Sequence, residues 1–442
     1  MTADARYIGV DLGTSGVRIV LTDGQDRILT QLQCSLPPPD QKDGRVSQDP
    51  ALWWQAVDGL MVRLGREADL HTVAALAVDG TSGTILVCDE TGEPLAPARM
   101  YNDRSAVAQG RRIDTVAPAD SMARGTGGAL ARLLGLLEET GATLPRFALH
   151  QADWIAGRLT GRYGQSDFNN CLKLGFDAVA QRWPAWMADL GFNLSLLPEV
   201  EPAGQPLGPL RPDLAERYAL PADCLVVRGT TDGNAAFLAA GRFEPGMAVT
   251  SLGSTLTVKL VSADPVFAPE FGVYSHRLLG HWLAGGASNT GGAAIARHFP
   301  VEELQRLTPQ LRPEAPTGLS YYPLPAPGER FPVADPDMQP SVSPRPEDDA
   351  VFLQGLLEGV ARIEREAYGR LASLGATPVA RVLTVGGGAA NAAWTRIRER
   401  VMGLPVGTAP QTEAAYGAAR LARLGYQGAV SLNAGPCSSR SR

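Results

Sequence analysis

Residues 6–22, RYIGVDLGTSGVRIVLT, contain two apolar stretches separated by a short turn of glycine and hydroxyl residues. Apolar, β-branched stretches of this length are typical of strands, and the turn between them predicts a hairpin. A further strand is predicted at residues 27–33, RILTQLQ, after the Asp23–Gly24 turn signal. We therefore expect three antiparallel strands at the start of the fold.

The same plan recurs at residues 247–262, MAVTSLGSTLTVKLVS, where SLGST occupies the place that DLGTS has in the first copy. A chain of 442 residues is also too long for one ordinary core. The repeat at the start of each half predicts a duplicated α/β fold. We expect one domain at residues 1–241, a second at 245–428 and a disordered tail at 429–442.

Other segments have clear helix and strand signals. Residues 47–65 show helical spacing, with Asp49 as the expected N-cap and Pro50 at the first helical position. Residues 380–406 predict a strand, a glycine turn, a helix and a short strand, and residues 412–424 predict a last helix. The region from about 110 to 220 resembles an insertion in the larger α/β frame.

Composition excludes several classes of partner and compartment. The formal charge is −6 without a cluster of basic residues, which disfavours nucleic acid. There is no apolar run of about 18 residues and no secretory signal at the start, so we expect a cytoplasmic protein that does not enter a membrane. The cysteines are odd in number and scattered, which predicts free thiols at Cys34, Cys88, Cys171, Cys224 and Cys437.

The turn after Asp11 has the composition of a phosphate-binding loop. Backbone N–H groups in a glycine-rich turn can face phosphate oxygens, and a carboxylate at the strand end could hold a hydrated Mg²⁺. A plain hairpin turn with Asp11 as a local acceptor is the alternative. The recurrence of the motif at Gly253–Thr255 favours phosphate binding.

Asp232, in GTTDGNAA, lies where a predicted strand passes into a helix of small residues. Phosphoryl transfer to an alcohol needs a carboxylate that accepts the hydroxyl proton, and this position suits one. The alternative is that Asp232 only caps the following helix. Local sequence leaves these two roles open.

Further motifs predict binding of a nucleoside and a polyol. The glycine turn in VGGGAAN, between a strand and a helix, could let a purine and ribose lie against the backbone. Neither GxxxxGK[ST] nor a dinucleotide fingerprint is present. Polar residues that could bind a sugar, but that are also common in turns, are Thr81, Ser82, Asn102, Asp103 and Asp167.

With DLGTSG, YND, GTTDG, SLGST and GGGAAN in this order, the chain resembles the FGGY carbohydrate kinases over nearly its whole length. The resemblance implies an actin-like ATPase fold of two ribonuclease-H-like lobes with a ligand cleft between them. It also implies ATP and Mg²⁺ as cofactors, with Asp232 as catalytic base and Asp11 as metal ligand. The first phosphate turn would be Gly13, Thr14, Ser15 and Gly16, which with Asp11 also borders the sugar. The nucleotide-binding residues would be Gly253, Ser254, Thr255, Gly285, Gly286, Gly386, Gly387, Gly388, Ala389 and Asn391.

Phrases such as LHQADW, LKLGFD, GVYSHRL and TEAAYGA resemble the compact D-ribulokinases of cyanobacteria and plants. Xylulokinases of the family carry a Met-His pair where this chain has Thr81–Ser82, which favours D-ribulose over D-xylulose. The alternatives are another pentulose or polyol kinase such as a xylulokinase, an actin- or Hsp70-like ATPase switch, and a regulatory pseudokinase. The sequence leaves open whether the protein is a monomer or a homodimer.

Overall fold

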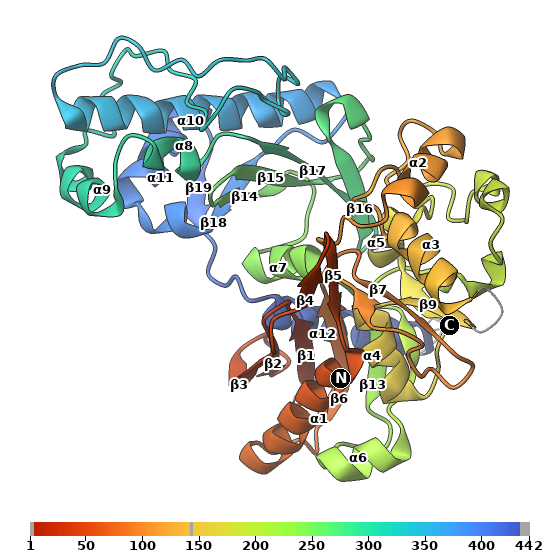
Figure 1. The fold of residues 1–442 in the computed structure, drawn as a ribbon. Coiled ribbons are helices and arrows are strands. Elements are labelled where there is room, and N and C mark those ends of the chain that lie inside the picture. The colour runs from red at the N-terminus through yellow and green to blue at the C-terminus, as the bar shows by residue number, and fades with distance from the viewer. Residues whose placement is uncertain (1–3, 142–144, 434–442) are drawn as a thin grey trace, which may run out of the picture. The chain divides into compact units, whose positions relative to one another are not determined.

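The structure is a computed structural model that describes residues 4–141 and 145–433 (Figure 1). Its contacts divide the chain into two compact units, Met1–Ala239 with Thr412–Arg442, and Ala240–Gln411. This division falls beside the expected boundary near residue 241. Residues 412–428, however, were expected in the second domain and belong to the first unit, because the last helix packs on the first sheet.

The first unit is built on a six-stranded sheet in the order β12-β13-β6-β1-β2-β3. As predicted, β1, β2 and β3 are successive antiparallel strands, whereas β1 pairs parallel with β6 and β6 with β13. The strands are β1 (Arg6–Leu12), β2 (Gly16–Thr22), β3 (Ile28–Ser35), β6 (Val73–Gly80), β12 (Pro206–Pro209) and β13 (Leu225–Thr231).

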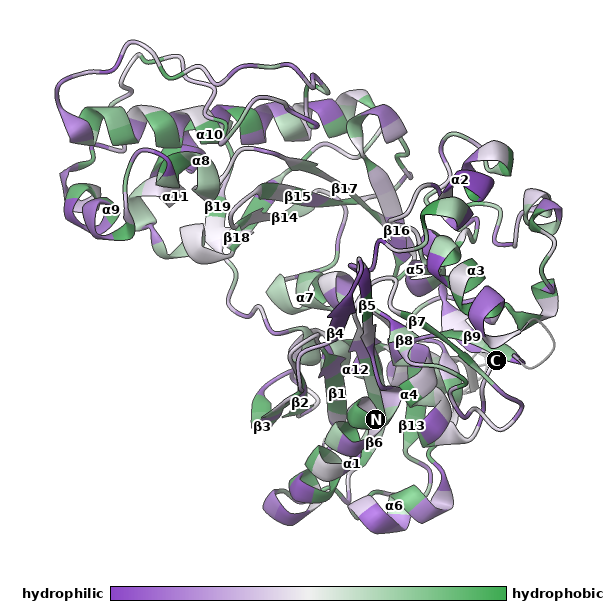
Figure 2. Ribbon diagram, viewed as in Figure 1, coloured by the Kyte–Doolittle hydropathy of each residue, from purple (hydrophilic) through white to green (hydrophobic). Residues whose placement is uncertain are grey.

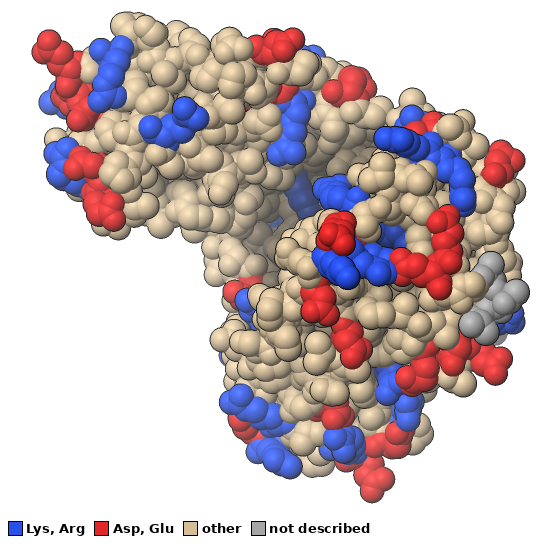
Figure 3. Space-filling view, in the orientation of Figure 1, with Lys and Arg blue, Asp and Glu red and all other residues tan. Residues whose placement is uncertain are grey.

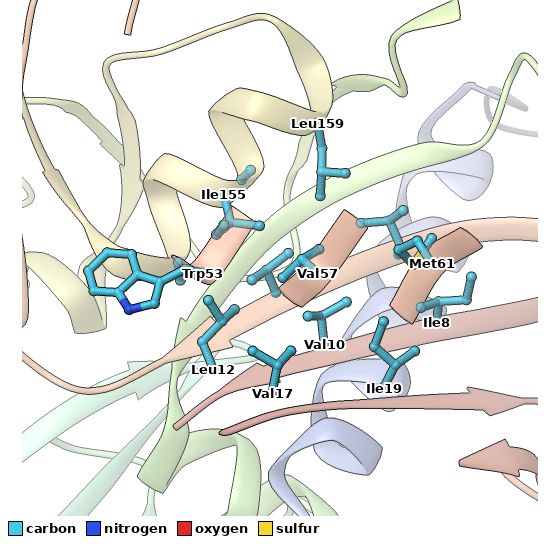
Figure 4. Close-up of a cluster of buried hydrophobic side chains, with 14 of the residues drawn as sticks. Ile8, Val10, Leu12, Val17, Ile19, Trp53, Val57, Met61, Ile155 and Leu159 are labelled. Carbon is cyan, nitrogen blue, oxygen red and sulfur yellow. The ribbon is translucent and has the colours of Figure 1, made fainter. Parts of the chain in front are cut away.

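Helices cover both faces of this sheet. Because side chains alternate along a strand, Ile8 and Val10 of β1 point to a core that includes Trp53 and Val57 of α1 (Pro50–Glu67), as Figure 4 shows. On the other face, Tyr7 packs in a cluster of mainly small residues with α12 (Ala414–Asn433). Both faces of β1 are therefore buried, which explains its continuous apolar run.

Helix α1 begins as the sequence predicts. The Asp49 side chain accepts a hydrogen bond from the Ala51 N–H, and Pro50 is the first helical residue. Buried residues recur at Trp53, Val57, Leu60 and Leu64, which is the spacing of one helical face.

The rest of the first unit adds a smaller sheet and several helices. The sheet has the order β4-β5-β8-β7-β9, and β10 pairs with β11. The strands are β4 (Asp40–Lys42), β5 (Arg45–Gln48), β7 (Ile85–Cys88), β8 (Ala98–Arg99), β9 (Phe147–His150), β10 (Gln165–Asp167) and β11 (Glu199–Glu201). The helices are α2 (Val107–Val116), α3 (Ala129–Thr140), α4 (Gln151–Thr160), α5 (Phe168–Cys171), α6 (Pro212–Tyr218) and α7 (Asp232–Ala240).

The second unit repeats the plan of the first. Strands β14 and β15 form the second hairpin, β15 pairs antiparallel with β17, and β14 pairs parallel with β18, as β1 does with β6. The full order is β16-β17-β15-β14-β18-β19. The strands are β14 (Met247–Leu252), β15 (Leu256–Ser262), β16 (Tyr274–Leu278), β17 (His281–Ser288), β18 (Arg381–Val385) and β19 (Val406–Thr408). The duplication predicted from the two hairpins is thus present in the strand pairing.

The helices of the second unit are α8 (Gly292–Ala296), α9 (Val301–Leu307), α10 (Asp349–Ser373) and α11 (Ala392–Met402). Helices α10 and α11 are joined by a fully buried, bidentate ion pair in which Arg398 donates from Nε and Nη2 to Glu364 at 2.6 Å each. Such a pair requires both partners, since a single buried charge would be uncompensated.

Hydropathy varies along the helices, and charges of both signs are mixed on the surface. Figure 2 shows hydrophilic and hydrophobic bands alternating along α10, and Figure 3 shows acidic and basic residues interspersed over the face that it draws. None of the helices in the described part of the chain is long and apolar enough to span a membrane. Cys34, Cys88, Cys171 and Cys224 are free thiols, as expected, and Cys437 lies outside the described residues.

Residues 429–433, which we expected to belong to a disordered tail, are part of a helix. Helix α12 continues to Asn433, so the first residues assigned to the tail are helical. Residues 434–442 lie outside the described part of the chain.

Candidate active site

Three carboxylates gather at the carboxyl ends of adjacent parallel strands in the first unit. Asp11 on β1 lies opposite Asp79 on β6, and Asp79 in turn lies opposite Thr230 on β13. Asp232 follows two residues later, as the first residue of α7. Its Oδ1 accepts from the N–H of Gly233, as a residue at a helix start can.

Asp79 is the site residue that sequence reasoning missed. It is fully buried, and neither of its carboxylate oxygens has a hydrogen-bond donor. Burial, then the charge of Asp11, and more weakly that of Asp232, raise the pKa of Asp79 well above its ordinary value. The available signal was that Val-Asp ends a predicted strand in both YIGVD and LAVD.

The first turn has the expected hairpin geometry. The N–H of Gly13 donates to the carbonyl of Gly16 at 2.9 Å, and Ser15 is exposed at the tip. Asp11 is 4% exposed and accepts from Nη1 of Arg18 at 3.2 Å. The turn therefore holds the Asp11 carboxylate beside accessible hydroxyl and N–H groups.

The predicted sugar wall at residues 81–82 contains two different environments. The Thr81 hydroxyl is buried and bonded to Gln151 Oε1 at 2.8 Å and to Thr84 Oγ1 at 2.5 Å. Ser82 is only partly buried. Thr81 thus fixes the loop against α4, while Ser82 keeps a hydroxyl that a ligand can reach.

Three other predicted sugar residues have different surroundings. Asp103 is fully buried and accepts from the Val46 N–H at 2.7 Å and from Arg99 at 3.2 Å, which anchors its loop. Asp167 caps α5 by accepting from the N–H groups of Asn169 and Asn170. Asn102 is exposed. The structure therefore gives Asp103 and Asp167 internal hydrogen-bonding roles that the turn-like sequence only partly suggested.

In the second unit, the second hairpin turn and the glycine turn line one cavity of about 930 Å³. Gly253 and Ser254 lie on it together with Gly387, Gly388 and Asn391. Thr255 adjoins Ser254 in the hairpin turn, and Gly386 and Ala389 belong to the same glycine turn. Motifs more than 130 residues apart in sequence thus meet because β14 and β18 are neighbouring parallel strands.

Most of the cavity wall was not predicted. It consists of apolar or uncharged side chains from α8, α9 and α10 and from Trp394 of α11, with Val301, Leu304, Gln305, Thr308, Leu353 and Leu357 among them. These residue types are common in a hydrophobic core, so the sequence contains no indication that they would line a ligand site. An apolar cavity with a glycine turn at its edge could enclose a flat heterocyclic ring.

A second loop supports the Gly253–Thr255 turn. The N–H of Gly292 donates to the carbonyl of Gly253 at 2.8 Å, and a Cβ on Gly292 would lie 2.8 Å from the same oxygen. The loop is fixed in turn by the buried Glu329, which accepts from Ser288 Oγ at 2.5 Å and from the Asn289 N–H at 2.7 Å. The segment GGASNTGG at residues 285–292 and the segment GERFP at residues 328–332 are therefore linked through Glu329.

Gly285 and Gly286 lie elsewhere. They belong to β17 and line a separate cavity of about 190 Å³ with Lys259, His276 and Arg330 among its other residues. The structure does not bring these two glycines onto the larger cavity, although Gly292 at the end of the same motif reaches it.

The carboxylates fit the expected Mg²⁺. Asp79 has two buried oxygens without donors and lies beside Asp11, and adjacent carboxylates need a proton or a cation between them. The described residues contain no group of three or more His, Cys, Asp or Glu that could hold a metal ion. Water and phosphate oxygens would complete the coordination, as is usual for Mg²⁺.

Comparison with known proteins gives the family. The model of the "FGGY family of carbohydrate kinases, N-terminal domain" matches residues 6–239, and that of the C-terminal domain matches residues 248–426. The chain belongs to the FGGY family of carbohydrate kinases.

Curated relatives share moderate identity with this chain. It is 25% identical to a xylulose kinase of Escherichia coli K12 over 95% of this chain and 90% of that protein. It is 27% identical to a xylulose kinase of Klebsiella pneumoniae, over 62% of this chain and 59% of that protein.

Solved structures confirm the fold. The "xyloylose kinase" from Brucella ovis superposes with a TM-score of 0.83 at 25% identity and covers 96% of this chain and 91% of its own. The expected actin-like α/β fold with two ribonuclease-H-like lobes is therefore correct.

Proposed function

We propose that this FGGY kinase transfers the γ-phosphoryl group of MgATP to the terminal C5 hydroxyl of a small ketose, with D-ribulose as the preferred substrate and D-ribulose 5-phosphate as product. The observation that carries the proposal is the convergence of Asp11, Asp79 and Asp232 at the ends of three neighbouring strands. Acidic groups at this edge suit the activation of an alcohol and the binding of a cation that accompanies phosphates.

Asp232 acts as the catalytic base in this proposal. Its carboxylate accepts the proton of the attacking hydroxyl and becomes neutral, while the new O–P bond forms, the bond between the γ-phosphorus and the bridging oxygen breaks, and ADP leaves. Asp11 and Asp79 would hold Mg²⁺, whose charge offsets that of the phosphate oxygens. The N–H groups of the turns at residues 13–16 and 253–255 would orient those oxygens.

The larger cavity of the second unit is the proposed nucleoside site. Its apolar wall suits a purine, and the glycine turn at Gly387–Gly388 lets the nucleoside approach the backbone. Gly253 and Ser254 on the same cavity would receive the phosphate end.

D-Ribulose is proposed over D-xylulose because of Ser82. These ketoses differ in configuration at C3, and this chain has Thr81–Ser82 where the xylulokinases of the family carry a Met-His pair. A site built to hydrogen-bond one hydroxyl leaves its polar groups unpaired when the hydroxyl points elsewhere. D-Xylulose remains the second candidate, because the curated relatives above are xylulose kinases.

The decisive experiment compares kcat/KM for D-ribulose and D-xylulose at saturating MgATP, together with ribitol and glycerol. We expect a preference for D-ribulose of roughly 30- to 1000-fold. Ser82→His should lower activity on D-ribulose, and Ser195→His, at an exposed serine of the same unit, is its control. Equal efficiencies, or a preference for D-xylulose, would refute the substrate assignment and leave the kinase assignment standing.

An ATPase switch that binds a protein partner is the alternative from another class. The kinase proposal requires that ATP consumption rises when a ketose is added and that one sugar phosphate forms per ADP. An ATP hydrolysis rate that is the same with and without added sugar would support the ATPase switch.

A further inference from the structure

Lys173 lies beside the proposed sugar wall. It belongs to the short 3-10 helix Leu172–Leu174, which follows α5 in the first unit. Its Cδ is 3.9 Å from the position that a Cβ on Gly83 would occupy, and Gly83 adjoins Ser82. The side chain is thus held at the loop that carries the accessible Ser82 hydroxyl.

The electrostatic surroundings of Lys173 are unfavourable for a cation. Burial and the neighbouring Arg132 lower the pKa of Lys173, with a smaller effect from Arg104, and Asp232 is the carboxylate that opposes them. The carboxylate of the proposed catalytic base is therefore close enough to influence the pKa of this ammonium group.

Lys173 differs from its neighbour Arg132 in how its donors are used. Arg132 donates to the carbonyls of Gly83, Asp103 and Gly127, so its guanidinium is part of the loop framework. Within residues 4–141 and 145–433, the Lys173 ammonium has neither a hydrogen bond nor an ion pair. It also keeps some contact with solvent, so that a ligand can reach it.

We propose that Lys173 is a substrate-binding residue whose ammonium group donates hydrogen bonds to hydroxyl or carbonyl oxygens of the ketose. This inference rests on the proposed function. A partly buried ammonium without acceptors is costly unless a ligand supplies them, and a polyhydroxylated sugar offers several oxygen atoms. The position beside Ser82 places this donor at the sugar and not at the nucleoside cavity, which belongs to the second unit.

The test uses Lys173→Met in the full chain. Because a charge-assisted hydrogen bond is lost, the KM for the ketose and its directly titrated dissociation constant should both rise by about 10- to 100-fold. The KM for ATP should change by less than about 3-fold. Lys173→Arg keeps charge and donors and should recover part of the ketose affinity, whereas Lys42→Met, at an exposed lysine, should change neither constant.

Thermal stability separates binding from a structural role. Removing a partly buried, unpaired cation should leave the Tm unchanged or raise it, so loss of ketose affinity without a lower Tm supports the proposal. A lower Tm with an unchanged ketose constant would overturn it, as would a fall in kcat with both KM values unchanged, which would place the ammonium at the transferred phosphoryl group. If the unmodified protein phosphorylates no ketose, the proposed function itself fails.

Discussion

The position of Asp232 is compatible with both roles that local sequence left open, since it starts α7 and also lies next to the other carboxylates at the strand ends. A residue at a helix start can be replaced by asparagine without losing the helix, because both side chains accept from N–H groups there. The substitution therefore isolates the chemistry of the carboxylate from its structural contribution.

We expect Asp232→Asn to lower kcat by about 10²- to 10⁴-fold with little change in ketose affinity, because a proton acceptor is lost and the shape is kept. Steady-state kinetics and ketose titration measure the two effects. Asp223→Asn, at an exposed position shortly before β13, is the control. Near-normal turnover of Asp232→Asn would remove Asp232 from the mechanism.

Asp167 gives a prediction on pH dependence. Burial, and then the charge of Asp153, raise the pKa of Asp167 to about 7. The folded state therefore binds this proton more tightly than the unfolded state, whose carboxyl has its ordinary pKa of about 3.9. Its contribution to the free energy of unfolding is complete below about pH 4 and is lost as the pH rises to about 7.

Asp167→Asn, which keeps an N-cap for α5, should make stability less dependent on pH between about 4 and 7. The slope should change by at most about 1.4 kcal/mol per pH unit. Urea denaturation at several pH values tests this. An identical slope in the variant would mean that Asp167 titrates in its ordinary range.

At the scale of elements, the close approach of α12 to the first sheet explains why the last helix joins the first unit. Small residues, Ala75 and Ala77 of β6 with Ala418 and Ala422 of α12, form the contact. Gly9 of β1 completes it, since a Cβ there would lie 1.9 Å from the carbonyl oxygen of Ala415. The absence of side-chain volume on both partners lets the helix backbone approach the strands.

Gly9→Ala should therefore destabilise the protein by about 1–3 kcal/mol or more, because neither backbone can move without disturbing the sheet. Chemical denaturation of the full chain measures the change. Gly59→Ala is a matched control, because Gly59 is an exposed position inside α1 with no atom within 4 Å of its added Cβ. It should be neutral or stabilising by up to about 1 kcal/mol, and a similar loss in both variants would contradict the packing argument.

On the scale of the whole molecule, the two units have different proposed ligands. ATP should protect backbone amides most strongly around the cavity of the second unit, at residues 252–256, 291–296 and 387–394. D-Ribulose alone should protect residues 79–84 and 229–234 of the first unit. Ligand binding to the folded state suppresses local opening, which is the physical reason for the protection.

Hydrogen exchange of the full chain with each ligand separately measures this division. Residues 213–217 of α6, which belong to neither proposed binding region, should exchange equally in all samples and serve as an internal reference. Protection by ATP confined to the first unit would contradict the assignment of the cavity.

The sequence by itself was sufficient to predict the family, the duplicated hairpins and the turn that carries Asp232. These features are local: a strand, its turn and the next strand are encoded by consecutive residues, and the order of five short motifs is specific. The sequence also predicted the N-cap of α1 correctly, because Asp49 and Pro50 act only on their own helix.

Only the tertiary structure decided which distant residues meet. The parallel pairing of β1 with β6 brings Asp79 to Asp11, and the packing of α8, α9 and α10 makes apolar residues the wall of a cavity. It also assigned Thr81 and Asp103 to internal hydrogen bonds and moved α12 to the first unit. These outcomes depend on contacts between segments far apart in the chain. The identity of a leucine or an aspartate does not by itself indicate which residues the fold places beside it.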